Sequence, residues 1–73
     1  MSEHLPFAGT LKTWSPRGYG LIQHDNDHRD VFLHISTLKL ARLIGLEIGA
    51  RVMFDVTQDS FNRLRATKIA RVK

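Results

Sequence analysis

The amino-acid sequence predicts a small all-β domain whose five strands close into a barrel. Short stretches of alternating apolar and polar residues recur along the chain, and clusters of Gly, Pro, Asp and Asn separate them. The chain has 73 residues, which is enough for one domain. Closing the sheet removes the exposed strand edges that a flat sheet would carry, so a barrel is the expected architecture.

Five segments carry the strand pattern, in which side chains alternate between two faces. They are residues 9–14, 18–24, 30–35, 50–57 and 63–72. The apolar positions that face inward form the expected core: Leu11, Ile22, Val31, Leu33, Ile35, Val52, Phe54, Val56, Leu64 and Ile69. In the last segment the inward phase slips between Ala66 and Ile69, which predicts a β-bulge. Ser36 is expected to cap a short helical turn after the third segment.

Two stretches lie outside this pattern. Residues 1–8 are expected to form a flexible N-terminal arm, so that the domain itself spans residues 9–73. Residues 38–48 follow neither period, although they contain Leu40, Leu43, Ile44, Leu46 and Ile48. We interpret this stretch as a lid on one end of the barrel, because a small core gains most from extra burial. The alternative is a protein-contact patch, through which two copies would form a weak homodimer.

The composition bounds the function classes. Eleven Lys and Arg against seven Asp and Glu give a net charge of +4, which suits a polyanionic partner but also an ordinary basic surface. Cysteine is absent, which excludes disulfides and favours a cytoplasmic setting. The chain starts without an apolar run, and no stretch approaches the roughly 18 apolar residues that span a membrane. We therefore expect neither a secretory signal nor a membrane partner.

Alternation in the second and third segments turns three rings away from the core. Val31 and Leu33 face inward, so Phe32 and His34 face outward, and Tyr19 takes the outward phase of the preceding segment. Exposed rings flanked by glycines and basic residues are unusual unless a flat ligand stacks on them. Nucleobases are flat, and every base has a π-face. The pattern therefore favours a single-stranded nucleic-acid partner.

Two motifs carry a family resemblance. Residues 17–22 read Arg-Gly-Tyr-Gly-Leu-Ile, and residues 30–36 read Asp-Val-Phe-Leu-His-Ile-Ser. In this order and spacing, with Lys12 ahead of them, they resemble the cold-shock domain family from about Gly9 to the end of the chain. The resemblance implies a five-stranded antiparallel oligonucleotide-binding (OB) fold that binds single-stranded RNA or DNA with low sequence specificity. It also implies a bacterial RNA chaperone or cold-shock-type regulator that uses no cofactor and is not an enzyme.

The resemblance also implies roles for individual residues. Tyr19, Phe32 and His34 match the family's stacking positions, Lys12 matches a backbone-contacting lysine, and Asp30 matches a rim position. Arg17 is, like Lys12, a basic residue that is expected to contact phosphates. Two positions depart from the pattern, because Leu21 replaces a second aromatic and Leu43 falls where the long loop usually offers a phenylalanine. A platform with fewer rings is expected to bind more weakly.

The first-strand tryptophan of the family is displaced in this chain. Thr13 holds its position, and Trp14 follows. Strict alternation would turn Leu11 and Thr13 inward and leave Lys12 and Trp14 outward. We therefore expect Trp14 to face water and to recover the lost stack.

Other readings of the polar residues are weaker. His24, His28 and His34 with Asp25, Asp27 and Asp30 match no tight metal-ligand spacing, so a turn with solvated charges is preferred to a metal site. No serine or cysteine stands in a nucleophile motif, so we expect no catalytic site. The last segment is rich in basic residues, which form either a flank that contacts phosphates or a solvated edge. They are Arg63, Arg65, Lys68, Arg71 and Lys73. The rival function is a protein-interaction module, or the soluble head of a larger protein, with a depleted platform.

Overall fold

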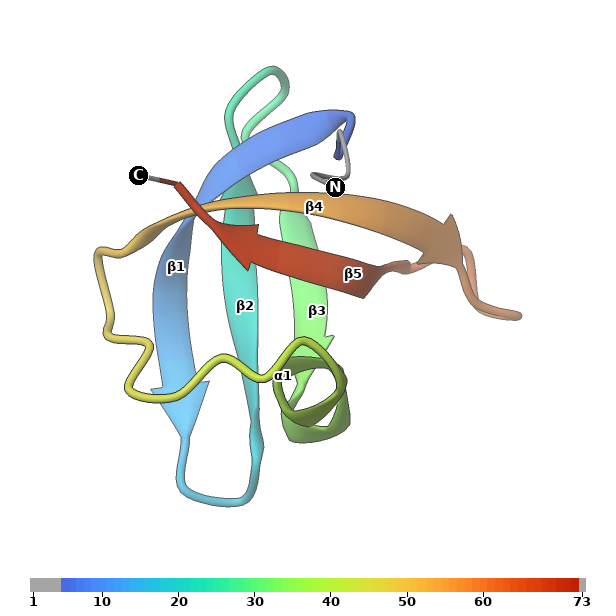
Figure 1. Ribbon diagram of the computed structural model, residues 1–73. Coiled ribbons are helices and arrows are strands. Elements are labelled where there is room, and N and C mark those ends of the chain that lie inside the picture. Colours follow the sequence, from blue (N-terminus) through green and yellow to red (C-terminus); the bar gives the residue numbers. More distant parts are fainter. Residues whose placement is uncertain (1–4, 73) are drawn as a thin grey trace.

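Five strands and one short helix make up residues 5–72, the part of the chain that the structure, a computed structural model, describes (Figure 1). The strands are β1 (Phe7–Ser15), β2 (Tyr19–His24), β3 (Asp30–His34), β4 (Arg51–Gln58) and β5 (Leu64–Arg71), and helix α1 (Ile35–Leu40) lies between β3 and β4. All five predicted strands are present, and the all-β prediction is confirmed. Within these residues no helix has the length and apolar character that crossing a membrane requires.

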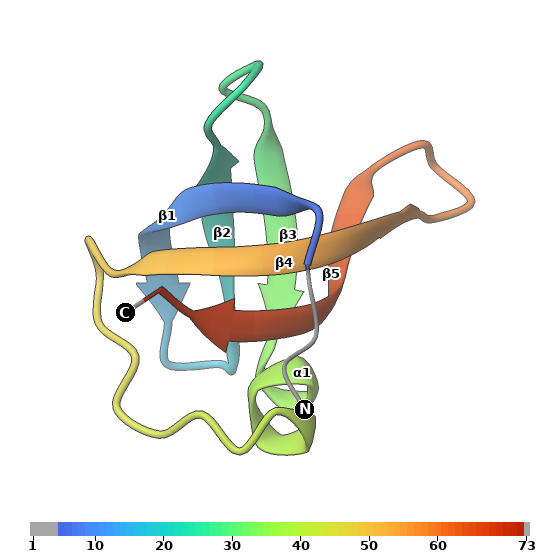
Figure 2. The same cartoon turned by 45° about the horizontal axis from the view of Figure 1, so that its top comes forward.

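The strands close into a barrel in the order β1-β2-β3-β5-β4, as the sequence predicts. Figure 1 shows β4 and β5 crossing in front of β1, β2 and β3. The prediction that all neighbours are antiparallel is wrong, because β3 and β5 pair in parallel with Phe32 opposite Arg65. α1 and the segment after it carry the chain across the barrel before the β4–β5 hairpin, which therefore returns β5 alongside β3 in the same direction (Figure 2).

The core lies between the two crossing layers. Its largest fully buried side chains are the predicted ones: Phe54, Leu11, Ile22, Leu33, Val31 and Val52. Ile69 is buried as predicted, whereas Val56 and Leu64 are only partly buried and pack against the core from its rim. Ile35 is not a core residue, because the chain turns into α1 there and leaves the side chain 37% exposed.

The start of β1 and the cap of α1 differ from the sequence prediction. β1 begins at Phe7, and Leu5 is 8% exposed, so these two residues belong to the barrel and not to a flexible arm. Residues 1–4 of the predicted arm lie outside the described residues. The cap of α1 is His34 instead of Ser36, since the His34 side chain accepts a hydrogen bond from the Ser36 backbone N–H.

Two β-bulges set the phase of the strands. The pairing of β4 with β5 shifts where Asp55 opposes Lys68 and Val56 opposes Ala66, which confirms the predicted bulge. A second, unpredicted shift lies in β1 between Leu11 and Thr13. β1 pairs with β4 only as far as Thr10, and beyond that point its strand pairing is with β2 alone. The bulge at Lys12 therefore reverses which face the rest of β1 presents.

Candidate nucleic-acid interface

Three rings lie next to one another on the outer face of β2 and β3. Tyr19 pairs with His34, and the rings of Tyr19 and Phe32 stack diagonally with centroids 5.7 Å apart and an interplanar angle of 24°. Phe32 and His34 follow with centroids 6.5 Å apart. Behind them Val31 and Leu33 are completely buried, so the predicted strand phase is correct here.

Glycines hold β2 close to its neighbours. A side chain at Gly20 would collide with the Thr13 carbonyl oxygen and would come within 2.7 Å of the Trp14 ring. Gly18 has a φ of +98°, a backbone conformation that side chains disfavour, and its carbonyl accepts the Ile35 N–H at 2.8 Å. The glycines on either side of Tyr19 are therefore required by the backbone that presents its ring.

His34 is oriented by its position at the start of α1. Its Nδ1 atom lies 2.9 Å from the Ser36 hydroxyl oxygen and accepts the Ser36 backbone N–H at 3.1 Å. These contacts fix the imidazole beside Phe32, so less side-chain entropy remains to be lost when a ligand stacks on it.

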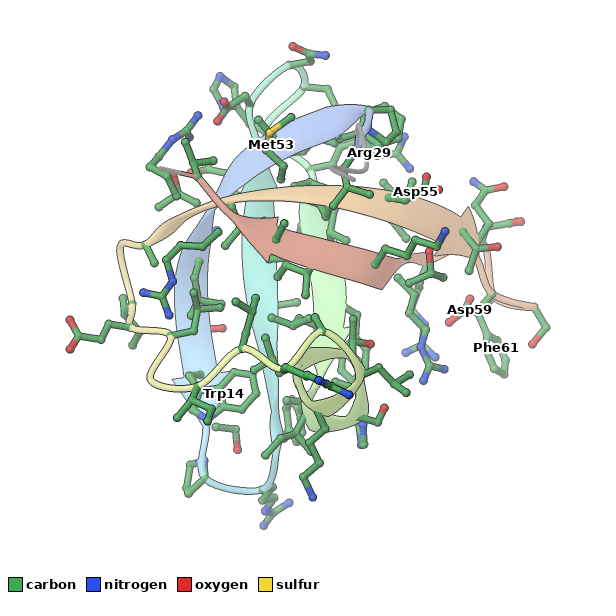
Figure 3. All side chains as sticks on the ribbon, in the orientation of Figure 1. Trp14, Arg29, Met53, Asp55, Asp59 and Phe61 are labelled. Atoms are coloured by element: carbon green, nitrogen blue, oxygen red, sulfur yellow. The ribbon has the colours of Figure 1, made fainter. Side chains whose placement is uncertain are left out.

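Trp14 does not belong to this face. Because of the bulge, Thr13 pairs with Leu21 in the outer row, and Trp14 pairs with Gly20 in the inner row. The indole is partly buried and packs against the core. Figure 3 shows it at the end of β1, on the side where the segment after α1 runs. The prediction that Trp14 faces water beside the three rings is therefore wrong, whereas a contact of its partly exposed ring with a base stays a prediction.

A row of paired residues extends the outer face beyond β3. Leu21 pairs with Phe32, and Phe32 pairs with Arg65 across the parallel strands. Arg65 then pairs with Thr57 of β4 and is exposed. The sequence did not distinguish Arg65 from the other basic residues of the last strand, because a parallel pairing between distant strands leaves no local pattern in the sequence.

A groove with a volume of about 560 Å³ opens beside Phe32. Leu21 and Phe32 line it on the β2–β3 side, and Asn62, Arg63 and Arg65 line it on the other. Arg29 and Asp30 line it as well. Leu64 and Asp59 complete the lining, so the groove combines apolar side chains with three arginines and two aspartates.

The predicted charged site residues lie around the same face. The Lys12 ammonium is 3.2 Å from the Asp30 carboxylate, and both side chains are about half exposed. This ion pair connects β1 with the start of β3. Arg17 is exposed in the turn before Tyr19. Leu43, in contrast, is partly buried and packs against the core.

The basic residues in and next to β5 lie in different parts of the structure. Arg63 and Arg65 line the groove, so these two lie where a phosphate flank was expected. Arg71 lies at the other end of β5 and donates a hydrogen bond to the Ile44 carbonyl at 3.0 Å. Lys73 lies outside the described residues.

His24 at the end of β2 and Asp25 at the start of the following turn have structural roles. His24 is buried, packs edge-on against Phe54 with centroids 5.6 Å apart, and accepts the Asn26 backbone N–H on Nδ1. Both oxygens of Asp25 accept hydrogen bonds from the Arg51 guanidinium, at 2.7 and 2.6 Å, which lowers the pKa of that carboxyl. Residues 5–72 contain no group of three or more potential ligands arranged to hold a metal ion.

Comparison with known proteins identifies the family of the chain. A family model described as the 'Cold-shock' DNA-binding domain matches residues 7–72. The chain belongs to the cold-shock domain family. The cold shock-like protein of Aquifex aeolicus (strain VF5) is 35% identical over 57 residues, which cover 77% of this chain and 81% of that protein. For the cold shock protein CspA of Rhizobium meliloti (strain 1021), the identity is 37% over 54 residues, with coverages of 73% and 78%.

A third relative covers more of the chain. The cold shock-like protein CspA of Rickettsia bellii (strain RML369-C) is 35% identical over 63 residues, which cover 85% of this chain and 89% of that protein. Cold-shock domains form a nucleic-acid-binding family and not an enzyme family. The chain is therefore a nucleic-acid-binding domain of the cold-shock type.

Proposed function

We propose that this cold-shock domain binds single-stranded RNA or DNA by stacking bases on Tyr19, Phe32 and His34. The observation that carries the proposal is the contiguous run of three rings on an outer face whose inner side is fully buried. A duplex keeps its bases stacked on one another, so only an unpaired strand offers free base faces to this surface. Lys12, Arg17 and Arg65 lie around the rings and supply positive charge for the phosphates.

The expected affinity follows from the number of rings. Base–aromatic stacking contributes about 1–3 kcal/mol per base, and phosphate contacts add a salt-dependent attraction. Ordering a flexible strand offsets part of this gain. Three stacks without Trp14 then lead to a dissociation constant on the order of micromolar. Stacking does not read base edges, so sequence preference is low.

Weak, sequence-tolerant binding of single strands suits an RNA chaperone or cold-shock-type regulator in the cytoplasm. Such a protein traps unpaired segments as they open and releases them readily, which disfavours unwanted pairing. The RNA-chaperone role follows from the proposed binding mode and depends on it.

A binding titration tests the proposal. Fluorescence anisotropy of an end-labelled eight-nucleotide strand should rise with a micromolar midpoint, for RNA and DNA alike. The same strand annealed to its complement should bind at least ten-fold more weakly. Equal affinity for the strand and the duplex would contradict base stacking and would leave only nonspecific attraction to phosphates.

We also propose a weak homodimer through residues 38–48. The observation that favours it is the outward position of Leu40, Ile44 and Ile48, which are 84%, 89% and 63% exposed. Sedimentation should show a dimer that forms with rising protein concentration and that Ile44→Asp abolishes. A wild-type protein that stays monomeric at millimolar concentration would contradict the dimer and would leave these side chains as solvated apolar surface.

A further inference from the structure

Among residues 5–72, one edge of β5 has no strand beside it beyond Arg65. β5 pairs with β4 from Leu64 to Arg71, but its pairing with β3 on the other side is confined to Arg65 and Phe32. Figure 2 shows α1 on the side of β5 that faces away from β4. An unpaired strand edge is a template on which another extended chain can add a strand.

The backbone of this edge points away from β4 at alternate residues. Val72 donates its N–H to the Arg51 carbonyl at 3.1 Å, and hydrogen-bonded and non-hydrogen-bonded residues alternate along an antiparallel pair. The N–H and C=O groups of Arg71 and Ile69 therefore point away from β4. Within the described part of the chain, no other element forms a hydrogen bond with these backbone groups. They are thus placed to pair with an added strand.

A second groove, with a volume of about 570 Å³, lies between this edge and α1. Its volume is in the range of sites that hold a small ligand or a few side chains. Leu40, which lines it from the end of α1, is 84% exposed. The second groove shares no lining residue with the groove beside Phe32. Its described lining is mainly apolar and consists of Leu5, Thr37, Leu40, Ala41, Thr67, Lys68, Ile69 and Ala70.

The charge around the second groove is positive. Residues 37–42 and 67–71, which border it, contain no acidic residue but four basic ones: Lys39, Arg42, Lys68 and Arg71. Asp55, opposite Lys68 on β4, offsets one of these charges. A second copy of the chain would bring the same positive charges against this edge, and like charges across paired strands are destabilising. An acidic segment has the complementary charge.

We propose that the open edge of β5 binds an extended acidic segment of another protein, which adds a strand beside residues 67–71. The backbone of the segment pairs with Ile69 and Arg71, and its apolar side chains enter the second groove against Leu40. Its acidic side chains face the basic residues around that groove. Because the two grooves share no lining residue, the three-ring face stays free. The domain then holds a protein and a single strand at the same time.

A designed peptide tests the proposal: seven residues that alternate glutamate and valine, capped at both ends. In NMR titrations it should shift the amide signals of residues 67–71 and of α1 and leave those of Tyr19 and Phe32 unchanged. The same sequence with every backbone nitrogen methylated cannot donate hydrogen bonds to the edge and should not bind. A version with lysine in place of glutamate should bind at least ten-fold more weakly, because its charge is repelled.

Two aspartate variants form a matched pair. Leu40 and Ile44 are 84% and 89% exposed, and each change adds one negative charge, but only Leu40 lines the second groove. Leu40→Asp should weaken binding of the glutamate–valine peptide about ten-fold or more, since it removes an apolar contact and repels the glutamates. Ile44→Asp should bind the peptide within about two-fold of the wild type, because solvent and salt screen its charge. Both variants should melt like the wild type.

Four results would overturn the proposal. Shifts at Tyr19 and Phe32 in place of residues 67–71, with displacement of a bound single strand, would mean that the peptide only imitates a polyanion at the three rings. Equal losses in Leu40→Asp and Ile44→Asp would indicate a general charge effect. Signals of residues 67–71 that move with protein concentration alone would make a second copy the occupant. Peptide binding that appears only after deletion of residues 2–4 would make the start of the chain itself the occupant.

Discussion

The outer face of β2 and β3 and the segment between α1 and β4 both expose apolar side chains, yet their supports differ. The rings of Tyr19, Phe32 and His34 stand on paired strands whose inner residues are completely buried. Residues 41–50 form no strand or helix. Their backbone is held at separate points, which include Leu43 N–H to the Leu38 carbonyl and Gly49 N–H to the Leu11 carbonyl.

This difference decides what each region can do. A strand ladder fixes adjacent side chains at repeating distances, so the rings form an ordered surface on which successive bases can stack. In the segment between α1 and β4 the apolar side chains divide, because Leu43 and Leu46 pack on the core while Ile44 and Ile48 face out, as does Leu40 at the end of α1. The same segment thus serves partly as the lid predicted from the sequence and leaves an outward patch as well. Substitutions of the three rings should therefore change binding without changing stability, whereas substitutions in the second region should change stability at some positions and association at others.

The largest expected effect comes from the support of the ring face. Gly20→Ala would push a methyl group onto the Thr13 carbonyl and the Trp14 ring, and overpacking of this kind costs about 1–3 kcal/mol. We expect a clear fall in the melting temperature. A Cβ at Gly45, in the other region, meets nothing within 4 Å, although its φ of +73° leaves about 1 kcal/mol of strain. A Gly20→Ala melt no lower than that of Gly45→Ala would contradict the close packing of β1 on β2.

A pair of aspartate substitutions divides the second region. Leu43→Asp should destabilise the fold by about 2 kcal/mol, because it removes packing against the core and brings a charge to a partly buried position. Ile44→Asp, one residue away at 89% exposure, should melt like the wild type. Chemical denaturation of both variants measures the difference. Two identical unfolding curves would remove the lid role of Leu43.

The smallest expected effect is on the salt dependence of binding. It distinguishes the contribution of the charged side chains around the rings from that of the rings themselves. If three to five phosphates are neutralised on a single strand, the plot of log K against log salt should have a slope of about −2 to −3.5. Arg65→Gln should make the slope shallower by about 0.7, whereas Phe32→Ala should lower affinity without changing it. A wild-type affinity that does not change with salt would contradict the phosphate contacts.

Local periodicity was sufficient to predict the strands, most of the core and the outward phase of Tyr19, Phe32 and His34. It failed where the barrel as a whole sets the geometry. Trp14 turns inward because β1 must leave β4 and bend toward β2, and the bulge at Lys12 that permits this has no signal in a single strand. Arg65 reaches Phe32 through a parallel pairing that closes the barrel between residues distant in the sequence. The division of residues 38–48 into packed and exposed side chains likewise depends on contacts outside the segment.

One comparison on β3 tests the account most directly. Phe32 and Val31 are neighbours, but Phe32 faces outward beside Tyr19 and Val31 is completely buried. Phe32→Ala should keep near-normal stability and lose about ten-fold or more in affinity for a short single strand, since a stacked base contributes about 1–3 kcal/mol. Val31→Ala should lower stability by about 2 kcal/mol through the cavity that it leaves, while the folded fraction still binds. A Phe32→Ala variant that unfolds, beside a Val31→Ala variant that stays intact and binds weakly, would reverse the assignment of the two faces and remove the proposed site.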